Sequence, residues 1–92
     1  MNPDFAQLHP ELTPLPVIAT YNAEGDFRPL YVQIDGNKYK VDNVKWSNED
    51  THSSMFFGVE FMDGEYVRSV TLVYIYSQHR WYLDAQNRQS FF

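Results

Sequence analysis

The side chains that most often carry out chemistry are sparse in this sequence and are poorly placed for it. Three histidines, His9, His52 and His79, fall in separate segments, and no two of them have the spacing of metal ligands. His52 and Asp50 could together contact a metal ion, but we interpret them as neighbours in a solvated loop. We therefore expect no metal site and no cofactor.

Nucleophilic catalysis also lacks its usual residues. The chain has no cysteine, which excludes disulfides, thiolate metal sites and a cysteine nucleophile. The motifs of serine hydrolases, zinc proteases and phosphate-binding loops are absent from the sequence. The adjacent carboxylates Glu49 and Asp50 are typical of a solvated pair. We expect no catalytic residue, and we rank enzymatic activity third among the functions considered.

The elements that must position any site are strands. With 92 residues the chain makes one domain. Between residues 15 and 84, β-branched and aromatic residues alternate with turn residues, which predicts strands at 15–21, 28–35, 38–46, 55–62, 65–76 and 80–84. We expect an all-β fold: a single antiparallel six-stranded meander that forms a strongly curved sheet or a small β-barrel. Residues 1–14 form a proline-rich lead-in with at most one helical turn, 47–54 a polar loop, and 85–92 a tail.

Turn positions predict which side chains share the core. A two-residue loop at Asp63-Gly64 pairs Phe61 with Tyr66, and one at Gln78-His79 pairs Tyr76 with Trp81. Both hairpins then place their apolar residues on one face. The turn at residues 35–37 does the same for its flanking strands, whichever two of its residues form the loop. The predicted core is Val32, Ile34, Tyr39, Val41, Phe57, Val59, Phe61, Val70, Leu72, Tyr74, Trp81 and Leu83.

Two residue patterns interrupt this regular alternation. The apolar phase of the third strand slips at Val44 and Trp46, which predicts a β-bulge near Asp42-Asn43. Arg68 is a charged residue on the apolar face. We expect it at the rim of the core, stacked on an aromatic ring and paired with a carboxylate.

The opposite face of the predicted sheet offers a candidate binding surface. Aromatic and basic side chains interleave there, as they do on proteins that hold single-stranded nucleic acid by base stacking and backbone charge. The net charge of −5 opposes such binding, but residues 28–92 hold all seven basic side chains and only eight of the twelve acidic ones. The candidate residues are Tyr31, Lys38, Lys40, Phe56, Arg80 and Tyr82.

Several short segments resemble a known family. Residues 16–21 (PVIATY), Gly25, Pro29-Leu30, residues 40–42 (KVD) and residues 81–83 (WYL) are similar to those of a family of small uncharacterised all-β proteins from Gram-positive bacteria. The similarity covers residues 15–84. It implies an accessory role, because members of that family lie near genes for DNA-repair polymerases, and it implies no catalytic residues.

These observations favour a non-catalytic module that binds a protein partner or serves as an accessory protein. The alternative is a single-stranded nucleic-acid-binding or DNA-repair accessory protein that uses the outer Tyr/Lys/Arg face. Unpaired sheet edges and the mildly apolar second face of strand 65–76 also predict a homodimer. The alternative is that the lead-in (Phe5, Leu8, Leu12) or the Phe91-Phe92 tail covers this face within one chain. The chain shows no membrane segment and no signal peptide, so we expect a cytoplasmic protein without membrane contact.

Overall fold

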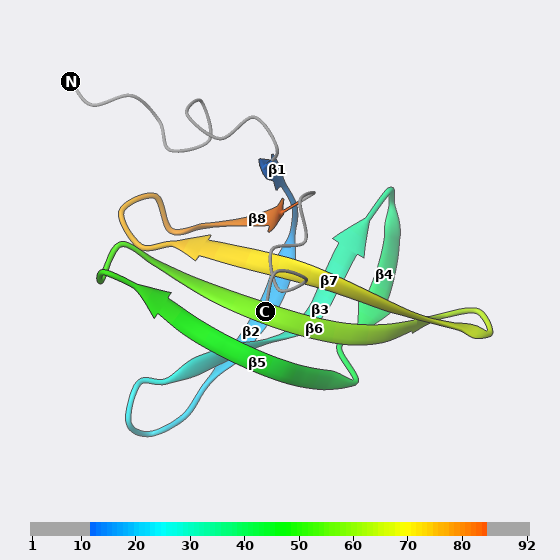
Figure 1. The fold of residues 1–92 in the computed structure, drawn as a ribbon, viewed down its shortest axis with the longest axis horizontal. Helices are drawn as coiled ribbons and strands as arrows, with labels where there is room; N and C mark the ends of the chain where they lie inside the picture. Colours follow the sequence, from blue (N-terminus) through cyan, green and yellow to red (C-terminus); the bar gives the residue numbers. More distant parts are fainter. Residues whose placement is uncertain (1–11, 85–92) are drawn as a thin grey trace.

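The computed structural model describes residues 12–84, in which the regular secondary structure consists of β-strands joined by short turns and linkers (Figure 1). The strands form a five-stranded sheet in the order β1-β8-β7-β6-β5 and a three-stranded sheet in the order β2-β3-β4. All neighbouring strands are antiparallel. The strands are β1 (Leu12–Pro14), β2 (Val17–Tyr21), β3 (Phe27–Ile34), β4 (Asn37–Lys40), β5 (Asn43–Asp50), β6 (Ser54–Asp63), β7 (Tyr66–Ile75) and β8 (Arg80–Asp84). The expected antiparallel all-β class is confirmed, but the single six-stranded meander is wrong.

The second sheet arises where one predicted strand divides in two. The N–H of Val41 donates to the carbonyl of Leu30 in β3, whereas the N–H of the next residue, Asp42, donates to the carbonyl of Glu60 in β6. The chain therefore passes from one sheet to the other between these two residues. The slip in apolar phase marks this crossing, and the β-bulge itself lies further on, between Val44 and Trp46.

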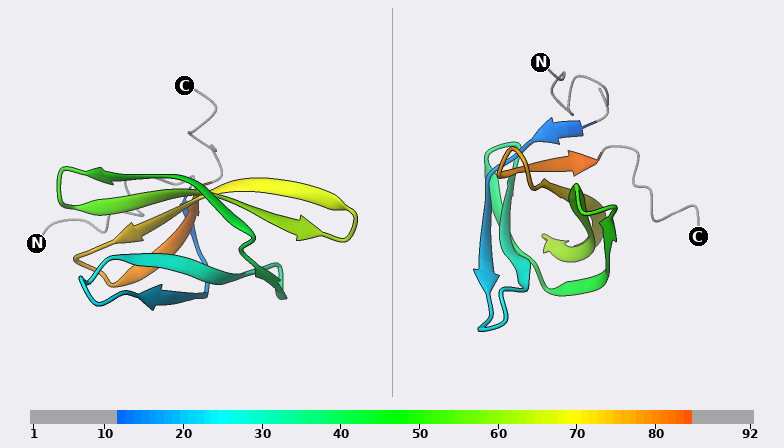
Figure 2. Two further views of the ribbon diagram at one scale, coloured as in Figure 1. Left: turned by 90° about the horizontal axis from the view of Figure 1, so that it is seen from below. Right: turned by 90° about the vertical axis from the view of Figure 1, so that its left-hand side faces the viewer.

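The three-stranded sheet packs on one face of the curved five-stranded sheet, and the main core lies between them (Figure 2). Val32 and Ile34 of β3 meet buried residues of β6 and β7. The two layers do not close into a barrel, because β1, β5, β2 and β4 remain edge strands in their sheets. The buried residues of this core are Val32, Ile34, Phe57, Val59, Phe61 and Leu72, and Tyr39, Val41, Val70, Trp81 and Leu83 pack against them as expected.

The hairpin registers show why most of the predicted core is right although two predicted pairings are wrong. Of the predicted core residues, Tyr74 is partly buried beside Trp81 and lies outside the core cluster. Asp63 pairs with Tyr66, so the loop is Gly64-Glu65, and Phe61 faces Arg68. In the next hairpin the partner of Trp81 is Tyr74. Both registers differ from the expected ones by two residues, and a two-residue shift leaves every side chain on the same face.

A second, smaller cluster lies on part of the other face of the five-stranded sheet. Val73, Ile75 and Tyr82 are buried there together with Leu12, and Phe56 packs against them. Leu12 reaches this cluster because β1 pairs with β8, with Leu12 opposite Asp84. Much of the β7 stripe that motivated the homodimer is therefore covered within the chain.

Two expectations about irregular segments are wrong. Residues 12–14 of the lead-in form a strand, and β5 continues through Asp50, so only the turn 51–53 remains of the predicted loop 47–54. The predicted helical turn at 4–9 and the tail 85–92 lie outside the described residues. No helix in the described part of the chain is long and apolar enough to cross a lipid bilayer.

Candidate binding surface

Three of the six residues predicted to bind a partner come together on the outer face of the three-stranded sheet. Tyr31 of β3 pairs across the strands with Lys40 of β4. The ammonium group of Lys38 lies 5.2 Å from the centre of the Tyr31 ring, in a cation–π contact. Both lysines are exposed, and Tyr31 is partly exposed. These residues form a small basic surface around one aromatic ring.

The other three predicted residues lie elsewhere. Tyr82 is 1% exposed within the second cluster and Phe56 packs beside it, so the solvent-facing position expected of these rings is wrong. Arg80 is exposed at the start of β8, in the other sheet. The fold therefore separates the six residues, because the predicted continuous face belongs to two sheets.

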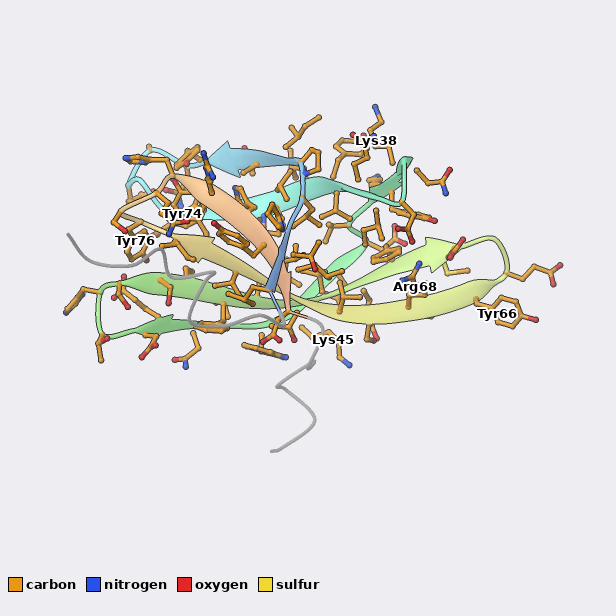
Figure 3. All side chains as sticks on the ribbon, turned by 90° about the horizontal axis from the view of Figure 1, so that it is seen from above. Lys38, Lys45, Tyr66, Arg68, Tyr74 and Tyr76 are labelled. Carbon is orange, nitrogen blue, oxygen red and sulfur yellow. The ribbon has the colours of Figure 1, made fainter. Side chains whose placement is uncertain are left out.

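Arg68 occupies the structural position expected of it. Its guanidinium lies 5.4 Å from the centre of the Phe61 ring and 3.1 Å from a carboxylate oxygen of Asp63. Both charged side chains are partly exposed near the tip of the β6–β7 hairpin, where Figure 3 shows Arg68 beside the end of the core. Arg68 thus caps the core and is satisfied within the chain.

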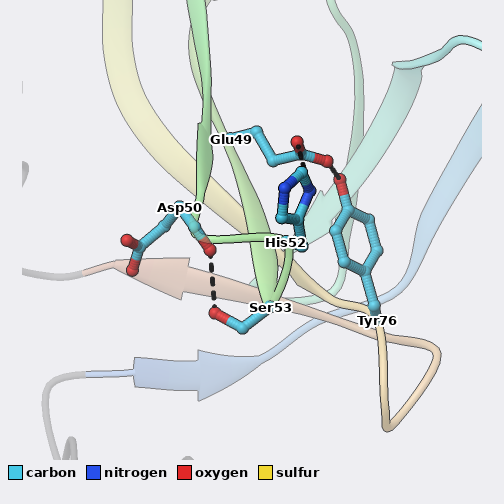
Figure 4. A network of polar contacts seen from close by, with 5 residues as sticks. All are labelled: Glu49, Asp50, His52, Ser53 and Tyr76. Carbon is cyan, nitrogen blue, oxygen red and sulfur yellow. Dashed lines mark hydrogen bonds and ion pairs between the residues drawn. The ribbon is translucent and has the colours of Figure 1, made fainter.

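One end of the five-stranded sheet carries a polar network around Glu49 (Figure 4). The carboxylate of Glu49 accepts a hydrogen bond from the Tyr76 hydroxyl at 2.7 Å and lies 3.2 Å from Nδ1 of His52. Asp50 is not the partner of His52; its carbonyl accepts hydrogen bonds from Ser53. Among residues 12–84 no three acidic or histidine side chains gather as metal ligands would.

This network stabilises the fold through a hydrogen bond from the Tyr76 hydroxyl to Glu49. Burial, followed by the hydrogen bond to Glu49, raises the pKa of Tyr76 to about 12. The phenol therefore stays protonated at neutral pH and acts as a hydrogen-bond donor. It fastens the β7–β8 turn to β5, and the N–H of Tyr76 adds a bond of 3.1 Å to the carbonyl of Ser53.

The sheet edges differ in how they are protected against pairing with other strands. Natural edge strands are kept short, bulged, or marked with proline and charged residues, because unpaired backbone groups attract further strands. β1 has three residues and ends at Pro14, β4 has two lysines among four residues, and β5 has a bulge at Lys45. β2, with the sequence VIATY, contains no proline and no charged residue, and the bulge in its pairing between Ile18 and Ala19 places the extra residue, Leu30, in β3.

The backbone of β2 offers a row of hydrogen-bonding groups to this open side. The carbonyl of Pro16 accepts from Gln33 of β3, and the N–H of Asn22 donates to Asp26, so even-numbered residues direct their backbone groups inward. By strand alternation, the N–H and C=O groups of Val17, Ala19 and Tyr21 point to the free edge. Within the described residues no strand pairs with β2 on that side.

Three cavities border β2. One of about 410 Å³ lies beside its start, lined by residues 14–16 and 79–81. One of about 280 Å³ lies at its end, between residues 20–22 and 26–28. A smaller one of about 90 Å³ opens on the outer face between Ile18, Tyr31 and Lys38. Ile18 and Tyr21 are 54% and 62% exposed, so apolar surface accompanies the open backbone groups.

Sequence reasoning did not single out β2 as a site. Its lack of charged residues was the available signal, but whether a strand lies at an edge depends on strand order, which is set by distant pairings.

Comparisons with protein-family models, with curated proteins and with solved structures find no match to this chain. The resemblance to a Gram-positive all-β family therefore stays a prediction, and the surface around β2 is the basis for assigning a function.

Proposed function

We propose that this protein is a non-catalytic binding module that accepts an extended segment of a partner protein as an additional strand along β2. The observation that carries the proposal is the free edge of β2, which contains neither a charged residue nor a proline, whereas β1 ends at a proline and β4 and β5 carry charged residues. Strand addition uses backbone hydrogen bonds for affinity and neighbouring pockets for specificity. The three cavities along β2 supply such pockets.

The expected affinity is modest. Each backbone hydrogen bond gained in water contributes about 0.5–1.5 kcal/mol net, and ordering a flexible segment opposes it. Backbone pairing at Val17, Ala19 and Tyr21 therefore supports binding only when side chains also fill the cavities. This requirement makes the module selective for particular segments.

Selection from a random library of displayed heptapeptides tests the proposal. Ala19→Pro removes an N–H that points to the free edge and breaks no bond to β3, whereas Ala19→Ser keeps that N–H and serves as the matched control. Selected peptides should bind the wild type and Ala19→Ser alike and lose most of their affinity for Ala19→Pro. A parallel test on the unchanged protein uses the same peptides with N-methylated backbones, which cannot pair as strands. Peptides that tolerate both changes would contradict strand addition.

A second candidate function rests on a separate observation. The strands β2, β3 and β4 contain Arg28, Lys38 and Lys40 but no carboxylate residue, and Tyr31 lies among them on the outer face. This arrangement supports binding of single-stranded nucleic acid through one stacked base and its neighbouring phosphates. A fluorescence titration with mixed oligonucleotides at low salt should then show a shift that Tyr31→Ala abolishes. The absence of a shift with the wild type would remove this candidate.

Two further expectations from the sequence stay predictions. One is a cytoplasmic location. The other is self-association, although the β7 stripe that motivated it is largely covered within the chain.

A further inference from the structure

The basic side chains of the described residues fall into two groups. Lys45 lies 3.5 Å from a carboxylate oxygen of Glu60, and Arg68 lies 3.1 Å from one of Asp63. The remaining four have no ion pair with any other described residue, although the chain as a whole has a net charge of −5. These four are Arg28, Lys38, Lys40 and Arg80.

Three of these four cations lie around β2, and the fourth, Lys40, lies on β4. Arg80 lines the cavity at the start of the strand, Lys38 the cavity on the outer face, and Arg28 the cavity at the end. Each of the three cavities thus has one cation, and the two lined by Lys38 and Arg28 lie over the β2–β3 pair. Figure 3 shows that Lys38 projects from the three-stranded sheet, on the opposite side of the molecule from the paired Lys45.

Carboxylates are scarce in the same places. Of the residues that line the three cavities, only Asp26 is acidic, and its carboxylate lies 3.5 Å from the side-chain amide of Asn22. The remaining lining residues are neutral or basic. The three cavities at β2 together therefore hold three cations and one carboxylate, on a protein whose net charge is negative.

We infer that the segment that adds to β2 is acidic, with carboxylate side chains that reach Arg80, Lys38 and Arg28. This inference rests on the proposed strand addition and specifies its partner. β2 spans about 17 Å at about 3.4 Å per residue, so a segment of five to seven residues extends from the first cavity to the last. Carboxylates on alternate residues of such a segment share one face and can meet Lys38 and Arg28 on the outer face of the three-stranded sheet. Arg80 lies in the other sheet, beside the start of β2, and can be reached by a carboxylate at the end of the segment.

Other occupants fit the surface less well. A second copy paired through β2 would bring two sheets with the same unpaired cations side by side, and like charges across an interface oppose association. Nucleic acid offers phosphates but no backbone groups that complete a β-ladder. Its bases would find one partly exposed ring, Tyr31, which Lys38 already covers. An acidic peptide satisfies both the backbone groups and the charges.

Fluorescence anisotropy with designed peptides tests the inference. The probe is a labelled seven-residue peptide with glutamate at alternate positions and valine between them, and its matched control has glutamine in place of every glutamate. At low salt we expect the acidic peptide to bind about tenfold more tightly, because several exposed ion pairs contribute together. The difference should nearly vanish in about 1 M salt, where the screening length falls to about 3 Å.

Substitutions of single cations in the protein show which of them contribute to the preference for the acidic peptide. Arg28→Gln, Lys38→Gln and Arg80→Gln should each weaken the acidic peptide about twofold to fivefold and leave the glutamine peptide unchanged. Lys45→Gln removes a cation on the other side of the molecule and should change neither affinity.

The outcomes separate this inference from the proposed function. Equal affinity for the two peptides, both lost with Ala19→Pro or with N-methylated backbones, would overturn the acidic partner and leave strand addition standing. If the acidic peptide binds equally well to Ala19→Pro, and equally well when its backbone is N-methylated, strand addition would be overturned. The binding would then be due to surface charge alone. Binding of neither peptide would contradict both, and oligonucleotide binding without peptide binding would assign the surface to nucleic acid.

Discussion

The indole ring of Trp46 lies directly over Gly58 on the neighbouring strand. An added Cβ at position 58 would overlap the ring atoms of Trp46, so only glycine fits beneath it. The two residues are cross-strand partners beside the bulge of β5. The glycine thus leaves room for a large ring from the edge strand β5 to pack against β6, which helps to fix the register of β5.

Gly58→Ala should therefore destabilise the protein by about 1–3 kcal/mol, the usual cost of overpacking. The effect of Gly58→Ala on the free energy of unfolding should change sign when the Trp46 ring is removed. In a Trp46→Ala background, Gly58→Ala should stabilise by up to about 1 kcal/mol, because alanine loses less backbone entropy than glycine in a strand. Urea unfolding of the four proteins gives the double-mutant cycle. Equal effects in both backgrounds would show that the ring does not impose the glycine.

Phe61 and its neighbour Met62 should respond very differently to truncation. Phe61 is fully buried between the sheets, whereas Met62 is 48% exposed on the opposite face. Phe61→Ala should cost about 3–5 kcal/mol, a large part of the stability of a domain this small. Met62→Ala should change the free energy of unfolding by less than about 0.5 kcal/mol. Similar losses for the two variants would argue against the sheet faces described above.

Tyr76 should titrate later than an ordinary tyrosine. Its pKa is raised to about 12, from 10.0, by burial and by the hydrogen bond to Glu49 (Figure 4). The folded state therefore holds this proton more tightly than the unfolded state. The resulting stabilisation is complete below about pH 10 and is lost as the pH rises toward about 12.

The difference between the phenolate absorbance titrations of the wild type and Tyr76→Phe isolates this group. We expect the difference curve to have its midpoint near pH 12 if the fold persists there. A midpoint near pH 10 in folded protein would show that the bond to Glu49 does not form in solution. Glu49→Gln, which removes the carboxylate charge, should move the midpoint toward lower pH.

The local sequence pattern predicts the core because side chains alternate between the two faces of a strand. A hairpin register that is wrong by two residues therefore still places each side chain on the correct face. Phe61 was expected opposite Tyr66 and lies opposite Arg68, yet both pairings place it on the same face. The rim position of Arg68 follows from the same rule. Tyr31, Lys38 and Lys40 were also correctly assigned to one surface, since they belong to a single tight hairpin.

The features that were not predicted depend on contacts between distant parts of the chain. A slip in apolar phase cannot distinguish a bulge from a crossing between sheets, so the division after Val41 was missed. The pairing of β1 with β8 has no local signal, and it buries Tyr82 together with Leu12. The edge position of β2 likewise depends on pairings between strands that are distant in the sequence.

Amide hydrogen exchange of the complex with the acidic heptapeptide tests the central claim most directly. If the peptide adds as a strand to β2, exchange at Val17, Ala19 and Tyr21 should slow on binding, since their N–H groups become paired. Lys38 and Lys40, whose N–H groups point to the opposite edge of the same sheet, provide the internal control and should not change. Unchanged exchange at all three β2 positions in a saturated complex, or protection at Lys38 and Lys40 instead, would contradict the account.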